Sequence, residues 1–183
     1  MFLLQWGQMG RAINREGTDW DGLYRMIKQK CDVFARLSSP LVDILTFGST
    51  NEEDIEDLYD SLLVRNIGST SVSKVLHVLN PRLFVPWDDN IRTNEKLRYR
   101  LYGKVQDVFV DSGRGYLEFL TAAKEEVTEA LKEKAGPSIL TSVVDQIIQN
   151  RLELKDGRLE PVYANKKTLA KLIDEYNWNK AWS

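Results

Sequence analysis

Two amphipathic helical patterns separated by a short polar turn restrict the fold of this chain more than any other feature. Each pattern has apolar residues at i, i+3, i+4 and i+7; the first ends at Leu63 and the second runs from Ser69 to Leu79. Asn66-Ile67-Gly68 predicts a tight turn between them, and we expect Gly68 to have a positive φ, which glycine adopts without steric cost. Asn80-Pro81 ends the second helix, because the residue before a proline disfavours helical conformation.

The rest of the chain repeats this period and predicts an all-α protein of about eight to ten helices. We expect one long apolar stripe over residues 20–37, with Cys31 buried in it, and another over residues 116–131. Asp156-Gly157 lies between two short apolar segments, as in the turn of a small β-hairpin. At 183 residues without a low-complexity linker, the sequence predicts one domain spanning residues 1–183.

The charge balance argues against a simple, strongly basic nucleic-acid binder. The chain has 25 basic and 27 acidic residues, but they are unevenly distributed. Residues 51–60 hold six acids and no base. Acidic side chains stabilise the positive N-terminal end of a helix, so we interpret this cluster as the start and a solvent-exposed face of a helix. Residues 91–104 hold five bases and one acid. This basic stretch is either a nucleic-acid contact or another solvated face.

Several classes of protein are excluded or disfavoured. A single cysteine rules out an internal disulfide and a four-cysteine iron–sulfur cluster, and we expect no cofactor. His77 lacks the partners of a zinc or Ser-His site, so we interpret it as a packing or surface residue, or a DNA contact. No apolar run approaches the roughly 18 residues of a membrane span, and Met1–Leu4 is too short for a signal peptide. We therefore expect a cytoplasmic protein without a membrane partner.

Residues 62–92 resemble the helix-hairpin-helix DNA glycosylase superfamily. Ile67-Gly68 matches the last two positions of that family's hairpin, L-P-G-[VI]-G, while Arg65-Asn66 replaces its Pro-Gly. Asp88-x-x-Ile91 matches the family's D-x-x-[VI] pattern, and Asp88 follows Gly68 by 20 residues, a separation common in that family. The resemblance implies a glycosylase-like fold with a helix-hairpin-helix subregion at about residues 51–102 and the remaining helices packed around it.

The resemblance implies that Asp88 is the catalytic carboxylate of a DNA N-glycosylase acting on damaged double-stranded DNA. Cleaving the bond between base and sugar builds positive charge on the sugar, which a nearby carboxylate stabilises. A helix N-terminus would keep Asp88 ionised. Thr70 stands where bifunctional relatives carry a lysine, so we expect one-step hydrolysis rather than a Schiff base. The alternative is that Asp88 is an ordinary helix N-cap.

The resemblance also implies that the hairpin binds a DNA phosphate through backbone N–H groups. The predicted DNA contacts are Arg65, Asn66, Gly68, Ser69, Thr70, Ser71, Lys74 and Arg92. Base flipping would need an aromatic-walled pocket, for which the candidates are Trp6, Trp20, Tyr24 and Trp87, although an aromatic residue of this kind more often belongs to the core. Two alternatives stay open: a non-catalytic module that docks DNA or a protein, and a purely structural helical interaction protein.

Overall fold

The computed structural model describes residues 17–39, 41–88, 91, 111–135, 152–155, 158–161, 168–171 and 173–174. Its helices are α3 (Trp20–Gln29), α4 (Cys31–Leu37), α5 (Ser49–Leu62), α6 (Ser69–Leu79) and α9 (Gly113–Ala135). Strands β1 (Leu152–Lys155) and β2 (Arg158–Pro161) pair antiparallel, in the region where the sequence predicts a small hairpin. The described residues are therefore predominantly helical, in agreement with the predicted all-α class.

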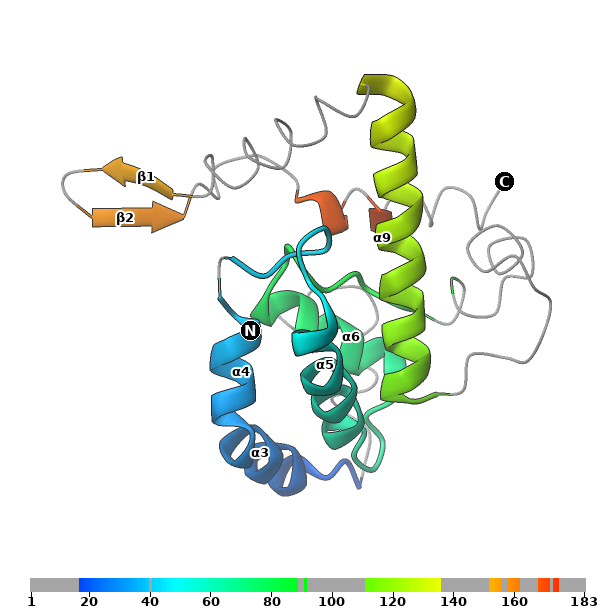
Figure 1. Cartoon of the computed structure of the whole chain (residues 1–183). Coiled ribbons are helices and arrows are strands. Elements are labelled where there is room, and N and C mark those ends of the chain that lie inside the picture. Colours follow the sequence, from blue (N-terminus) through cyan, green and yellow to red (C-terminus); the bar gives the residue numbers. More distant parts are fainter. Residues whose placement is uncertain are drawn as a thin grey trace.

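Helix α5 is the centre of the packed core. In Figure 1, α9 runs along one side of α5, α3 and α4 lie on the other side, and α6 lies behind it. The apolar face of α5 is buried, and its Tyr59 stacks on Tyr116 of α9 with ring centroids 4.6 Å apart. Helix α9 begins close to α5, since the Gly113 N–H donates to the Asp60 carboxylate at 2.6 Å and a Cβ on Gly113 would lie 2.2 Å from the Glu56 carbonyl oxygen. Helices α3, α4, α6 and α9 therefore all pack against α5.

Residues 20–37, where the sequence predicts one long apolar stripe, do not form a single continuous helix with a buried face. The helix is interrupted at Lys30, and the side chains of Trp20, Tyr24 and Ile27 are 44%, 66% and 38% exposed. Cys31 is exposed as well, so the prediction that it is buried is wrong. The physical reason is that the face holding Leu23, Phe34 and Leu37 packs against the core instead. Lys30, at the interruption, pairs with Asp57 of α5 at 2.6 Å.

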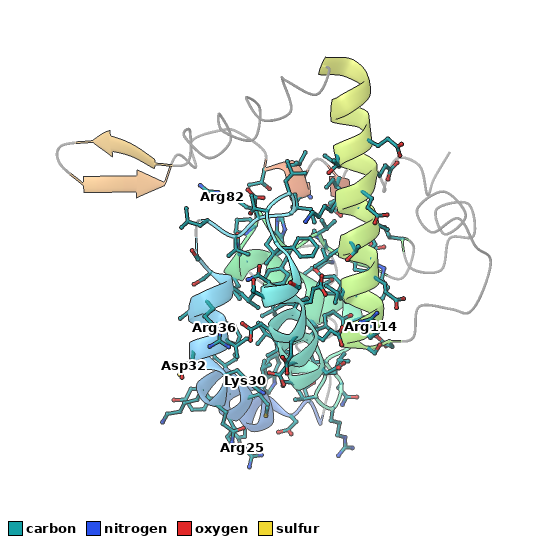
Figure 2. All side chains as sticks on the ribbon, viewed as in Figure 1. Arg25, Lys30, Asp32, Arg36, Arg82 and Arg114 are labelled. Carbon is teal, nitrogen blue, oxygen red and sulfur yellow. The ribbon has the colours of Figure 1, made fainter. Side chains whose placement is uncertain are left out.

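The acidic cluster of residues 51–60 holds neighbouring helices against α5. Arg36 of α4 makes a two-pronged contact with Asp54, both oxygens at 2.7 Å, and Arg114 of α9 pairs with Glu56 at 3.0 Å. Figure 2 shows Lys30 and Arg36 on one side of α5 and Arg114 on the other. The hydrogen bonds from Arg36 lower the pKa of the Asp54 carboxyl, because they favour its ionised form. The acids therefore do more than occupy a solvated face.

A short helical segment near the C-terminus docks on the loop that follows α6. The Thr168 hydroxyl donates to the Pro81 carbonyl at 2.6 Å, and Ala170 and Ile173 belong to the hydrophobic core. On the same segment Lys171 donates to Asp174, which is 3% exposed. No local pattern in the sequence predicts the contact of Thr168 with Pro81.

Candidate nucleic-acid interface

The predicted interruption between two helices is confirmed. Helix α5 ends at Leu62, α6 begins at Ser69, and the Ile67 N–H closes the turn by donating to the Val64 carbonyl at 2.8 Å. The expected positive φ falls on Asn66, at 64°, whereas Gly68 is extended with φ −93°, so that prediction is wrong for Gly68. Asparagine tolerates the left-handed conformation, which leaves Gly68 free to take the extended geometry that precedes a helix.

The start of α6 has no capping side chain, because its N-cap residue is Gly68. The Gly68 carbonyl accepts the N–H groups of Ser71 at 2.9 Å and Val72 at 3.0 Å, which begins the helix. Ser69 is 3% exposed, and its hydroxyl has no hydrogen-bond partner in the described part of the chain. Thr70, Ser71 and Lys74 are half-buried, and Gly68 is exposed. An uncapped helix start of this kind suits an anion.

The segment before α3 packs beside the hairpin, a contact that sequence reasoning missed. The Asp19 N–H donates to the Arg65 carbonyl at 3.3 Å. A Cβ placed on Gly17 would lie 3.7 Å from the side-chain nitrogens of both Arg65 and Asn66. Arg65 itself remains exposed. Arg65 and Asn66, two of the predicted DNA contacts, therefore lie where the hairpin meets the segment that leads into α3.

Helix α6 is tied to the segment that precedes Asp88. The Ser73 hydroxyl oxygen accepts the Trp87 N–H at 2.9 Å and lies 3.3 Å from the Trp87 carbonyl oxygen. Trp87 is 1% exposed and stacks on Phe119 with centroids 5.6 Å apart. Trp87 is thus a core residue rather than the wall of an open base pocket. Trp20 and Tyr24 lie on the surface of α3, and Trp6 lies outside the described residues.

Asp88 is half-buried and acts as a helix cap. Its Oδ1 accepts the Ile91 N–H at 3.0 Å, which is the geometry of an N-cap residue, and Ile91 is helical and 3% exposed. The capping interpretation of Asp88 is therefore confirmed, and its catalytic role stays a prediction. Arg92 and the rest of the basic stretch up to Lys104 lie outside the described residues.

Asp174 is an ionisable residue that sequence reasoning did not assign to this site, and it interacts electrostatically with Lys171, His77 and Asp88. His77 is 7% exposed and Asp174 is 3% exposed, and Lys171 pairs with Asp174 at 2.5 Å. Burial raises the pKa of Asp174, its neighbours Lys171 and His77 lower it, and Asp88 raises it again. Asp88 therefore contributes to the charge around Asp174 although the two residues are far apart in the sequence. No local pattern in the sequence predicts this.

Comparison of the chain with models of protein families, with curated proteins and with solved structures finds no match. Among the described residues, no group of three His, Cys, Asp or Glu side chains is arranged to hold a metal ion. The helices in the same part of the chain include none with the length and apolar character needed to cross a membrane. A functional interpretation therefore depends on the geometry of the hairpin and of Asp88.

Proposed function

We propose that this chain is a divergent helix-hairpin-helix DNA N-glycosylase that removes a damaged base by hydrolysis, with Asp88 as the catalytic carboxylate. The observation that carries the proposal is the hydrogen bond between Ser73 and Trp87. Ser73 lies one turn into the helix that begins at the hairpin, and Trp87 directly precedes Asp88. The bond therefore holds an anion-binding helix start and a carboxylate in one rigid arrangement.

The hairpin supplies the contact with DNA. A phosphate oxygen accepts the first N–H groups of α6, which no side chain caps, and the exposed Arg65 adds a positive charge. The hydroxyls of Thr70 and Ser71, on the first turn of the same helix, add further donors. Binding of this kind depends strongly on salt, because each neutralised phosphate releases counterions.

Asp88 supplies the charge for the chemical step. Its Oδ1 is oriented by the Ile91 N–H, and no described residue donates to its Oδ2. That second oxygen stabilises the positive charge that develops on the sugar, or it orients the attacking water. Thr70 has no amine to form a Schiff base, so the proposed product is an abasic site without strand cleavage.

Single-turnover base release from a panel of damaged duplexes tests the proposal. We expect release by the wild type and none by Asp88→Asn, while DNA binding stays intact or tightens slightly. Asparagine still caps a helix, so folding is retained, whereas Asp88→Ala also loses about 1 kcal/mol of capping free energy. The matched control is Asp21→Asn, an exposed carboxylate in the first turn of α3. Undiminished release by Asp88→Asn refutes the catalytic role.

A non-catalytic DNA-docking module is the second candidate, and one observation favours it. The bond from the Ile91 N–H explains Asp88 as a cap without any chemistry. This candidate predicts no base release by the wild type from any duplex, together with salt-dependent DNA binding. Fluorescence anisotropy at several salt concentrations measures the binding, and Arg65→Gln should reduce the slope of log K against log salt by about 0.9. A DNA-binding constant that does not change with salt concentration would contradict both candidate functions.

A further inference from the structure

Helix α3 has an exposed apolar face that the proposed chemistry at Asp88 does not use. Trp20, Tyr24 and Ile27 are spaced at i, i+4 and i+7, so they lie on one side of the helix, which we call the outer face of α3. They make up three of the five large apolar side chains that are exposed in the described part of the chain. Single exposed apolar residues are common on protein surfaces, whereas a row of them indicates a binding surface.

The opposite side of α3 is already occupied by the core. Gly22 is buried and Leu23 packs against the hydrophobic core. The Gly22 N–H donates to the Asp19 carboxylate at 2.7 Å, which caps the helix. Because residues two positions apart lie on nearly opposite sides of a helix, a rotation that buried Tyr24 would expose Gly22. The exposure of the outer face is therefore determined by the packing of α3.

The cations next to the outer face are free, unlike those that face α5. Lys30 and Arg36 both form ion pairs with acids of α5. Arg25 and Lys28 of α3 are exposed, and no described residue forms an ion pair with either. Figure 2 shows Arg25 at the lower edge of the view, whereas Lys30 and Arg36 lie next to α5. The one acid within α3 is Asp21, so the exposed charge of this helix is on balance positive.

The outer face begins beside the hairpin. Trp20 directly follows Asp19, whose N–H donates to the Arg65 carbonyl at 3.3 Å. A Cβ on Gly17 would lie 3.7 Å from Nη2 of Arg65, so the guanidinium also lies next to the segment that leads into α3. Arg65 is exposed, and no described residue pairs with it. The uncapped start of α6, the Arg65 cation and the outer face of α3 are thus adjoining features.

This combination of groups matches the chemistry of an unpaired nucleic-acid strand. Aromatic rings stack on bases, and nearby cations neutralise the phosphates that join those bases. A base in an intact duplex has both faces covered by its neighbours, so only an unpaired base has a free face for Trp20 or Tyr24. An aromatic side chain has roughly 150–250 Å² of surface in total, so these three partly exposed side chains fall well short of the roughly 800 Å² per partner of a stable protein interface.

We propose that the outer face of α3 is a stacking platform for single-stranded nucleic acid. Trp20 and Tyr24 stack on unpaired bases, and Arg25 and Lys28 neutralise the neighbouring phosphates. The strand continues from the phosphate at the hairpin, and in this respect the inference rests on the proposed function. It deepens that function, because it names DNA with unpaired nucleotides beside the damaged base as the form that the protein binds.

Fluorescence anisotropy with a labelled oligothymidine of about 12 nucleotides, at low salt, tests the platform. We expect the wild type to bind, and Tyr24→Leu and Trp20→Leu each to weaken binding by about tenfold, since one stacked base is lost. Leucine keeps an apolar side chain and favours a helix, so folding is retained. Tyr24→Phe is the matched control and should bind as the wild type does, because it keeps the ring. No binding by the wild type, or equal losses in the two Tyr24 variants, overturns the platform.

The contribution of charge has a separate readout. Lys28→Gln should reduce the slope of log K against log salt by about 0.7 for the single strand, since one phosphate contact is lost. Asp21→Asn removes the one acid of α3 and should strengthen binding, because it removes a repulsion from the phosphates. An unchanged slope in Lys28→Gln, together with unchanged binding in Asp21→Asn, contradicts the placement of the strand on this face.

Ile27 separates the nucleic-acid platform from a contact with a second copy of this chain. Ile27→Ala removes apolar area but no ring, so oligothymidine binding should fall by less than in Tyr24→Leu. If two copies met through the outer face, Ile27→Ala would shift the sedimentation equilibrium toward the smaller species. Such a shift overturns the proposal, and its absence supports it.

The platform and the glycosylase function fail in different experiments. Oligothymidine binding that depends on Trp20 and Tyr24, without base release from any duplex, would support the platform and count against the glycosylase function. Base release that Asp88→Asn abolishes, with strand binding unchanged in Trp20→Leu and Tyr24→Leu, would overturn the platform alone. Circular dichroism of each variant confirms that the helices are retained.

Discussion

The Trp87 N–H donates to the hydroxyl oxygen of Ser73 at 2.9 Å, joining the helix that follows the hairpin to the residue before Asp88. Both residues are buried, Ser73 at 0% and Trp87 at 1% exposure. The contact is made inside the core, where a lost hydrogen bond cannot be replaced readily by water. The position of Asp88 relative to the hairpin is therefore a property of the core rather than of the surface.

Replacing Ser73 by alanine should destabilise the protein. Ser73→Ala leaves the buried Trp87 N–H without its acceptor, and we expect the free energy of unfolding to fall by about 1–3 kcal/mol. Urea unfolding followed by far-UV circular dichroism measures it. Ser71→Ala, on the same helix but half-buried, is the control and should cost clearly less. Equal losses in the two variants would contradict the importance of the bond to Trp87.

The backbone of the turn makes a prediction about Asn66. Because Asn66 has a φ of 64°, Asn66→Ala should cost about 1 kcal/mol, as alanine is strained in the left-handed region. Asn66→Gly should cost less, since glycine adopts positive φ freely. Thermal unfolding of both variants compares them. A larger loss in the glycine variant would show that the asparagine side chain, rather than its backbone, determines the stability of the turn.

Gly113 should tolerate no side chain. A Cβ there would lie 2.2 Å from the Glu56 carbonyl oxygen, so α9 would have to move away from α5. We expect Gly113→Ala to lower the free energy of unfolding by about 1–3 kcal/mol or more, as overpacking does. Gly68→Ala is the matched control, because a Cβ at Gly68 meets nothing within 4 Å. A tolerated Gly113→Ala would contradict the close approach of α9 to α5.

The pair of Arg36 and Asp54 predicts a pH dependence. The hydrogen bonds from Arg36 hold the pKa of Asp54 below its unfolded value of about 3.9, so their stabilising effect is present above that pH. It is lost as pH falls through the lower pKa of the folded state. Asp54→Asn should thus be less stable than the wild type at pH 7, and this difference should narrow as the pH falls from about 3.9 toward 3.

Chemical denaturation at a series of pH values between these limits measures that difference. Asp21→Asn serves as the control, because Asp21 is exposed in the first turn of α3. Its difference from the wild type should stay small throughout. A difference for Asp54→Asn that does not narrow as the pH falls from about 3.9 to 3 would mean that the carboxylate stabilises α5 in some way other than through Arg36.

The local helices and their ends can be predicted from the amino-acid pattern alone. The bounds of α6, the interruption before it and the all-α class of the described residues follow from apolar period, Gly68 and Asn80-Pro81. The capping role of Asp88 was also recognised as an alternative from its position before a helix. These features depend on residues within a few turns of one another, so a local pattern is sufficient to predict them.

Which helix face is buried, and which distant residues meet, depends on packing between segments of the chain. The apolar period of residues 20–37 is real, yet the face with Leu23, Phe34 and Leu37 packs on the core and Cys31 is exposed. The positive φ belongs to Asn66 rather than Gly68, because the glycine takes the extended N-cap position. The segment that holds Thr168, Ala170 and Ile173 packs against the loop after α6 through contacts between segments that no local pattern connects. Packing and charge pairing across the chain therefore determine the candidate site, whereas periodicity determines its helices.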